Sequence, residues 1–242
     1  MVIRDSEIMA ELQHIDPFSS PRPGTPVLKI QDSMITARVI NRPNRFLVKV
    51  RTDNGDLLCH LHDPGRLEEL IFQGNRVLIR ETRGKKTAYS VTAAAHGSEW
   101  VITDTRFHSA IARKFLPEDA VPEVRVGNHR LDFMSGQTYI EIKGCTLMVG
   151  NTAMFPDAPT VRGTSHLKLL RSLRNSGYGA ELIILILRSG AQCFIPNRRT
   201  DPEFYSEFMM MLDSGVIVHT PSFSFDGAIL TYEGEIPLCK QL

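Results

Sequence analysis

Residues 182–187 form the longest uninterrupted apolar run of this chain, and they limit its possible folds more than any other segment. A strand that is apolar at every position must be covered on both faces, because a solvated sheet face would bring in alternating polar residues. Apolar residues at helical spacing occur on both sides of the run, within 162–176 and 201–212. The sequence therefore predicts an α/β (α+β) fold in which helices flank a mixed sheet.

The N-terminal half has a different pattern, made of short strands separated by turn residues. Asn54-Gly55 is a strong hairpin signal, and one helical turn is expected at 66–70. The expected strands are 35–40, 45–51, 57–62, 75–81 and 87–95. Five short strands with one helical turn predict an OB-like barrel, a fold that often binds nucleic acid. Phe46, Phe72 and Tyr89 would then either stack on bases or fill the barrel core.

We divide the chain into an N-terminal extension and linker at 1–33, an OB-like DNA-binding domain at 34–98 and a mixed-sheet domain at 99–242. The extension contains a short helix at 6–14, and prolines at 19–26 that exclude regular structure. In the last domain we expect helices at 104–115, 162–176 and 201–212. The expected strands there are 122–126, 129–134, 138–147, 181–187, 192–195 and, as edge strands, 216–219 and 228–232.

Charge is distributed unevenly along the chain. The whole sequence carries a net charge of +1, but residues 34–98 contain eleven Lys and Arg against six Asp and Glu. A basic barrel is suited to binding DNA phosphates. The alternative is that these cations only solubilise loops, and the residues concerned are Arg42, Arg45, Lys85 and Lys86.

The cysteines and the apolar segments bear on the cellular environment. Four cysteines are widely spaced and contain no Cys-x-x-Cys pair, which favours reduced thiols over a zinc site. No apolar run approaches the length of a membrane span, and acidic residues interrupt the first 30 positions. We therefore expect a soluble cytoplasmic protein without a membrane partner.

Residues 130–143 carry the strongest chemical signal, since they read as two strands joined at Ser135-Gly136. Side chains alternate between faces along a strand, so a hairpin can bring Asp132 beside Glu141 and Lys143. Two carboxylates can hold Mg²⁺ together with waters and substrate phosphates, and a lysine can orient the attacking water. The alternative is an ordinary solvated sheet face.

Residues 155–167 then strengthen the first interpretation. They read Phe-Pro-Asp-Ala-Pro-Thr-Val-Arg-Gly-Thr-Ser-His-Leu, and they follow His62-Asp63-Pro64-Gly65-Arg66-Leu67 and Asn44-Arg45-Phe46-Leu47-Val48 earlier in the chain. In order and spacing, these blocks and the Asp132…Glu141-x-Lys143 pattern resemble the sugar fermentation stimulation protein A (SfsA) family. The resemblance extends over about residues 34–238.

The resemblance implies an OB-like barrel, a domain similar to PD-(D/E)xK nucleases, DNA binding with little sequence preference and a role in regulating sugar-utilisation genes. Asp132, Glu141 and Lys143 fall on the nuclease motif. Mg²⁺ or Mn²⁺ would be held by Asp132, Glu141 and the backbone carbonyl of Ile142. This chain has Ser109 where family members tend to carry an acid. The nearest acid, Asp104, would either cap the following helix or enter the site.

Further residues complete the candidate site. Arg162 at a helix start would contact phosphate or pair with Asp157. His166 is either a hydrogen-bond partner behind the site or a buried histidine with a structural role, and Arg66 serves DNA phosphate or the domain interface. The predicted DNA-binding residues are Arg45, Arg66, Lys85, Lys86 and Arg162.

Three functions remain open from the sequence. The protein is a DNA-binding metal-dependent nuclease, a DNA-binding regulator whose nuclease-like site is inactive, or a carbohydrate- or nucleotide-binding module. No Gly-rich phosphate loop supports the nucleotide version of the third.

Overall fold

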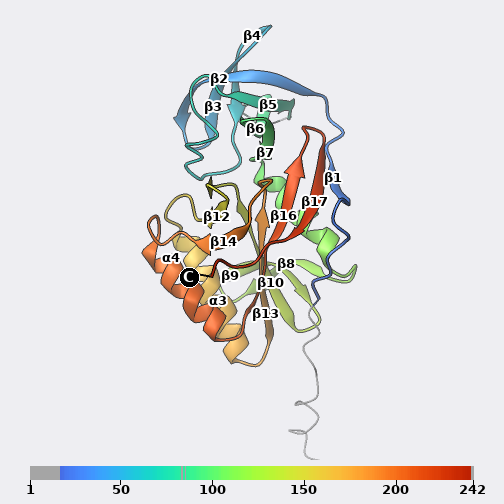
Figure 1. Cartoon of the computed structure of the whole chain (residues 1–242), viewed down its shortest axis with the longest axis vertical. Helices are drawn as coiled ribbons and strands as arrows, with labels where there is room; N and C mark the ends of the chain where they lie inside the picture. Colours follow the sequence, from blue (N-terminus) through green and yellow to red (C-terminus); the bar gives the residue numbers. More distant parts are fainter. Residues whose placement is uncertain (1–16, 83, 85, 241–242) are drawn as a thin grey trace, which may run out of the picture.

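The computed structural model describes residues 17–82, 84 and 86–240. A barrel forms one end of the molecule, and a long sheet with helices forms the other (Figure 1). The expected α/β class with an OB-like barrel and a mixed-sheet domain is confirmed.

The barrel consists of the five predicted strands, each within a few residues of its expected position. They are β2 (Met34–Asn44), β3 (Leu47–Thr52), β4 (Gly55–His60), β5 (Arg76–Glu81) and β6 (Tyr89–His96). Their order is β4-β3-β2-β5-β6, and a parallel pairing of Cys59 with Tyr89 closes the barrel. Buried valines and isoleucines such as Val50, Ile79 and Val91 fill it. An additional strand, β7 (Glu99–Ile102), pairs with β6 and leads into the second domain.

The expected helix at 104–115 is broken into three short pieces. They are η1 (Thr105–Phe107), α2 (His108–Ala112) and η2 (Arg113–Phe115). The Asp104 carboxylate accepts a hydrogen bond from the Arg106 N–H, which tightens the first turn. Leu116 is extended, as expected for a residue before proline, and it ends the segment. The prediction of one continuous helix is therefore wrong.

The second domain is built on an eight-stranded sheet in which the order is β1-β17-β16-β13-β10-β9-β8, while β15 also pairs with β13. β13 is buried at every position and runs parallel to β10, as the apolar run predicts. The sheet strands are β1 (Pro26–Lys29), β8 (Val121–Val126), β9 (His129–Ser135), β10 (Thr138–Cys145), β13 (Gly179–Ile186), β15 (Ile217–His219), β16 (Pro221–Phe225) and β17 (Ile229–Glu235).

Helices α3 (Val161–Asn175) and α4 (Pro202–Asp213) lie together on one face of this sheet (Figure 1). Leu167 and Leu170 of α3 pack with Leu182 and Ile184 of β13 in one core cluster. Gly177 follows α3 with a φ of +91°, the left-handed conformation expected of a glycine that ends a helix. The opposite face is covered by a second cluster that includes Ile111, Phe115 and Tyr232.

Three strands of the second domain were not foreseen, because their partners are distant in sequence. β11 (Met148–Val149), β12 (Thr152–Phe155) and β14 (Cys193–Pro196) form a small separate sheet in which β12 and β14 are parallel. β16 is the inner neighbour of β17, so the segment that we expected as an edge strand at 228–232 lies between β16 and β1.

The expectation of four reduced cysteines is wrong. Cys193 and Cys239 form a disulfide whose Cα atoms are 5.0 Å apart, while Cys59 and Cys145 are free and buried. The segment around Leu238 pairs with Phe194, and this backbone contact brings the two cysteines together. A bond between residues 46 positions apart depends on tertiary pairing, which Cys spacing alone does not show.

The expectation that prolines keep the segment before the barrel unstructured is wrong for its last part. Pro26 begins β1, which pairs with β17 at an edge of the sheet, a position that tolerates proline. Phe18 stacks on Phe115, and the Ser19 N–H donates to the Phe115 carbonyl. This segment is therefore part of the second domain's sheet. The helix expected at 6–14 lies outside the described residues.

A buried ion pair joins the barrel strands to the sheet domain. Arg188, which is fully buried after β13, donates to a carboxylate oxygen of Glu99 on β7 at 2.8 Å. The same guanidinium donates to the Thr146 carbonyl at 3.0 Å, and its third nitrogen lies 2.9 Å from His96 Nδ1. Ser189 donates to the second oxygen of Glu99. These contacts fix the orientation of the barrel over the sheet.

Candidate functional site

Asp132 and Glu141 lie side by side at the point where β9 and β10 begin to separate. The antiparallel register pairs Ile140 with Phe133, and its continuation places Glu141 opposite Asp132. One oxygen of Asp132 accepts a hydrogen bond from the Ile142 N–H at 2.7 Å, which replaces the ladder bond at this position. The hairpin thus brings the two predicted carboxylates together.

Glu141 is almost completely buried and has strongly different surroundings at its two oxygens. Oε1 contacts both the Lys143 ammonium and His166 Nδ1. Oε2 is buried and has no hydrogen-bond partner among the described residues. Burial by itself would raise the pKa of Glu141, but the Lys143 ammonium and the His166 ring bring that pKa below its ordinary value.

The pKa of Asp132 is displaced in the opposite direction. Burial, followed by the neighbouring Glu141 carboxylate, raises this pKa to about 6. Two close carboxylates with oppositely displaced pKa values are typical of sites in which a proton or a cation is shared. At neutral pH the pair therefore attracts a cation, while one of its oxygens remains without a partner.

The residues present fit a hard divalent cation. Mg²⁺ is commonly held by one or two carboxylates, with waters and substrate phosphates as its other ligands. Asp132 and the partnerless oxygen of Glu141 supply that minimal set. Within 17–82, 84 and 86–240 no group of three or more His, Cys, Asp and Glu side chains is placed to hold a metal ion. A cation here would therefore depend on water and on the substrate for most of its ligands.

Lys143 faces a cavity of about 330 Å³ between the barrel and the sheet domain, which Asp63, Asp157 and Arg45 also line. Asp157 accepts a hydrogen bond from the Leu67 N–H at 3.0 Å. A Cβ at Gly65 would lie 2.5 Å from the same carboxylate, so this close approach requires glycine. Asp157 thus joins the two domains, and the alternative in which it pairs with Arg162 is not observed.

His108 is a site residue that the sequence analysis missed. It lines the same cavity as Lys143, and its ring lies so close to Gly144 that any side chain there would collide with it. Burial lowers the pKa of His108 to about 4, so the ring is neutral at physiological pH. The glycine directly after Lys143 is the only local signal for this contact in the sequence.

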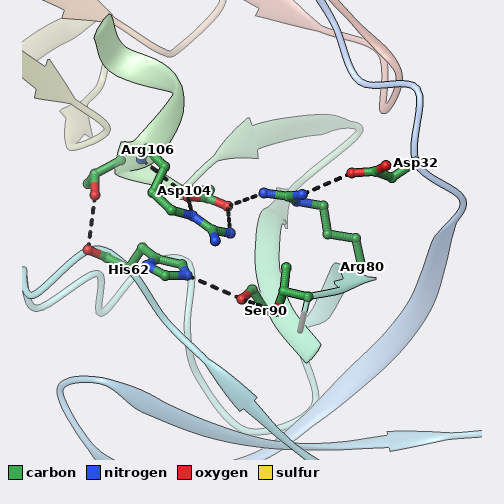
Figure 2. A network of polar contacts seen from close by, with 8 residues as sticks. Asp32, His62, Arg80, Ser90, Asp104 and Arg106 are labelled. Atoms are coloured by element: carbon green, nitrogen blue, oxygen red, sulfur yellow. Dashed lines mark hydrogen bonds and ion pairs between the residues drawn. The ribbon is translucent and has the colours of Figure 1, made fainter. Parts of the chain in front are cut away.

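Asp104 has a structural position, which decides between its two expected roles. It is fully buried and pairs with Arg80 and Arg106, as Figure 2 shows. In the same network Arg80 reaches Asp32, and His62 lies 3.2 Å from the Ser90 hydroxyl. Asp104 therefore caps the short helix and does not join Asp132 and Glu141. Ser109 is exposed and lies outside the cavity.

The predicted DNA-binding cations occupy different places. Arg45 is exposed, with its guanidinium 5.0 Å from the centroid of the Phe46 ring, and Arg66 is exposed as well. Lys86 lines a cavity of about 430 Å³ on the barrel together with His60 and His62. Lys85 lies outside the described residues.

Arg42 and Arg162 differ from these cations in their surroundings. Arg42 donates to backbone carbonyls, including that of Gly65 at 2.7 Å, so it supports the loop rather than solubilising it. Arg162 lines a third cavity, which His166 also borders.

The aromatic side chains of the barrel also divide. Phe46 is 41 % exposed and Phe72 is 50 % exposed, so neither is a core residue, whereas Tyr89 packs partly against the barrel core. The Phe46 ring is nearly parallel to that of His60 at a centroid distance of 6.3 Å. An exposed aromatic next to arginine is a typical surface for stacking on bases.

Comparisons with known proteins agree with this architecture. Residues 40–103 match the SfsA N-terminal OB domain, and residues 101–228 match the sugar fermentation stimulation protein RE domain. The "Sugar fermentation stimulation protein homolog" of Saccharolobus solfataricus is 49 % identical over 95 % of both chains. The Thermoplasma acidophilum homolog is 48 % identical over 87 % of this chain and 95 % of its own. The chain belongs to the sugar fermentation stimulation protein family.

A solved structure is also similar over nearly the whole fold. Its title is "The structure of Pyrococcus Furiosus SfsA in complex with Ca2+", and it superimposes with a TM-score of 0.82 at 25 % identity. The match covers 89 % of this chain and 99 % of that one. Separately, none of the helices in the described part of this chain is long and apolar enough to cross a membrane.

Proposed function

We propose that this member of the sugar fermentation stimulation protein family binds DNA and cleaves its phosphodiester bonds with a divalent cation, Mg²⁺ or Mn²⁺, at Asp132, Glu141 and Lys143. The observation that carries the proposal is the buried, partnerless oxygen of Glu141 beside Asp132. Leaving a buried carboxylate oxygen unpaired is costly, unless a ligand completes its contacts. The Ca²⁺ named for the Pyrococcus furiosus relative supports a cation at such a site.

Each side chain has a task that its surroundings favour. Asp132 and Glu141 would hold the cation, with the Ile142 carbonyl as a third protein ligand. The cation would polarise the scissile phosphate and stabilise its developing charge. Lys143, which contacts Glu141 and faces the cavity, would orient the attacking water or bind a phosphate oxygen. His166 holds Glu141 from the opposite side and fixes its orientation.

The barrel would supply most of the DNA affinity. Arg45, Arg66 and Lys86 are cations on its surface, and Phe46 adds an exposed ring. Contacts of this kind recognise phosphates and base faces without reading sequence. We infer a largely non-specific DNA-binding protein, and the family name suggests that its activity is connected with regulation of sugar utilisation.

A second candidate is a DNA-binding regulator that has the fold but does not cleave. The exposed Ser109 favours it, because related sites tend to carry an acid at this position. In that case Asp132 and Glu141 would bind a cation without supporting hydrolysis.

One experiment separates the two candidates. Supercoiled plasmid is incubated with the protein and Mg²⁺, Mn²⁺ or a chelator, beside Lys143→Ala and Lys168→Ala. We expect cleavage only with a cation, a loss of at least ~100-fold in Lys143→Ala, and no change in Lys168→Ala. Lys168 is a matched control because it is exposed and paired with Glu203.

Calorimetry with Mn²⁺ completes this test. Asp132→Asn is expected to weaken cation binding, whereas Lys143→Ala retains it. Cation binding without cleavage by the parent protein would favour the regulator, and absence of binding would refute both candidate roles of the carboxylates.

A further inference from the structure

We propose that the cavity between the β8–β9 turn and the start of α3 binds the terminal phosphate monoester of a DNA strand. This inference rests on the proposed function, since it names the form of DNA that the same site would act upon. The terminal phosphate could belong to a 5′ or a 3′ end, because both present the same chemical group.

The cavity has a volume of about 530 Å³ and is lined almost entirely by cationic or hydrogen-bonding side chains. Two short segments that are distant in sequence supply them. Residues near the tip of the β8–β9 hairpin form one wall, and the first two turns of α3 form the other. The lining residues are Arg125, Asn128, His129, Arg130, Arg162 and His166.

The guanidinium groups keep most of their donors available. Each arginine has five N–H donors. The side chain of Arg125 donates to the Gly127 carbonyl, and Arg130 donates to Glu123 at 2.9 Å. Arg162 has no hydrogen bond or ion pair with any residue that the structure describes. Three arginines with a single carboxylate between them form a site that lacks an anion.

Phosphate is the anion that this arrangement fits best. Guanidinium groups bind phosphate oxygens in a bidentate manner, and the three cations surround a volume rather than a flat surface. A terminal monoester carries a charge of about −1.5 to −2 at neutral pH, whereas a phosphodiester within a strand carries about −1. Several cations around one position therefore favour the monoester.

The neighbouring charges also favour a strand end over a continuous strand. Glu123 lies beside the cavity and is 60 % exposed at its side chain, where it is paired with Arg130. A strand that continued past Arg130 would bring another phosphate towards this carboxylate, and the two like charges would repel each other. A strand that ends in the cavity avoids that repulsion.

His166 connects this cavity with the carboxylate pair. Its ring lines the cavity, while its Nδ1 contacts Glu141. The His129 ring meets it edge to face at 6.0 Å and closes the wall. A terminal phosphate held by Arg162 would thus lie on the far side of His166 from Glu141, and cleavage would occur within a few nucleotides of the end.

The test measures binding in the presence of chelator, so that it does not depend on cleavage. Affinities are compared for one short duplex with a 5′-phosphate, a 3′-phosphate or only hydroxyl ends. We expect about tenfold tighter binding of one phosphorylated form, as one added set of charge-assisted hydrogen bonds would give. Inorganic phosphate is expected to compete with that form and not with the hydroxyl form.

Variants locate the effect. Arg162→Ala is expected to reduce the preference to less than twofold, and Arg125→Ala to weaken it as well. Arg174→Ala is the matched control, because Arg174 lies in the last turn of the same helix. Arg162→Lys keeps the charge without the planar fork and is expected to fall between the two.

The outcomes separate this inference from the proposed function. Lys143→Ala is expected to retain the preference although it does not cleave, so an inactive protein with a clear preference contradicts only the nuclease role. Equal affinity for all three duplexes, or a preference that Arg162→Ala leaves unchanged, would overturn the terminal-phosphate site.

Discussion

The barrel and the sheet domain use charged residues in opposite ways. In the barrel the ion pairs lie at the surface, as in the contacts of Lys49 and Arg51 with Asp56 on neighbouring strands. In the sheet domain charged side chains such as Glu141 and Arg188 are almost completely buried. The barrel thus spreads charge over a binding surface, whereas the sheet domain places single charges at defined points.

This difference separates binding from chemistry. Surface charges act through the field of many cations, and each one contributes little because water screens it. Buried charges are costly without a partner, so each must be part of a particular contact. We therefore expect substitutions in the sheet domain to have large, specific effects and those in the barrel to have small, additive ones.

The largest effect on stability is expected at the buried ion pair between the domains. Glu99→Gln would leave the Arg188 guanidinium buried without its carboxylate, and breaking such a pair costs about 3–5 kcal/mol. Chemical denaturation of the variant measures the loss. Asp56→Asn breaks a surface pair in the barrel, and it is expected to leave the unfolding midpoint unchanged. Equal effects of the two substitutions would contradict the comparison.

A somewhat smaller effect is expected at the disulfide. Cys193 and Cys239 close a loop of 46 residues, and removal of a native bond of this kind costs about 2–4 kcal/mol. The double Cys→Ser variant and the reduced parent protein should show the same lowered melting temperature. If the reductant lowered the melting temperature of the double variant as well, the effect would not arise from this bond.

The same division explains what the sequence could predict. Every barrel strand was found, because hairpins such as the one at Asn54-Gly55 and the period-two pattern are local signals. The hairpin carrying Asp132 and Glu141 was found for the same reason, although their roles remain predictions. β13 was found because an unbroken apolar run has few other interpretations.

Features that depend on distant pairing were missed. β12 pairs with β14, and β1 pairs with β17 near the other end of the chain, so nothing in the local sequence of either indicates a strand. The Cys193–Cys239 bond follows from such pairing as well. The position of His108 against Gly144 depends on how the short helix α2 packs on β10. Neither contact has a periodicity that a sequence pattern could show.

The pH dependence of cation binding sharpens the comparison further. The pKa of Asp132 is raised to about 6 from an unfolded value near 3.8, so its proton stabilises the folded protein at low pH. That stabilisation is fully present below pH 3.8 and is lost as the pH rises through about 6. A cation competes with the same proton, so Mn²⁺ affinity should rise about tenfold per pH unit up to pH 6 and then level off.

Calorimetry between pH 5 and 7.5 measures this dependence. Asp132→Asn is expected to abolish the steep part of the profile. In the barrel, the guanidinium of Arg51 and the ammonium of Lys49 lower the pKa of Asp56, so Asp56→Asn should leave the profile as it is. A flat profile in the parent protein would show that Asp132 is not a cation ligand.

The smallest single effects are expected from the cations of the barrel. Each phosphate contact that is lost should weaken DNA binding by a few-fold at low salt, equally for all sequences, and reduce the slope of log affinity against log salt by about 1. Arg45→Ala is expected to do more than Arg66→Ala, because the Arg45 guanidinium also covers the Phe46 ring. Fluorescence anisotropy across a salt series gives both quantities. A tenfold or larger loss from Arg66→Ala alone would mean that the barrel has a specific phosphate site, and the division between the two domains would then fail at that residue.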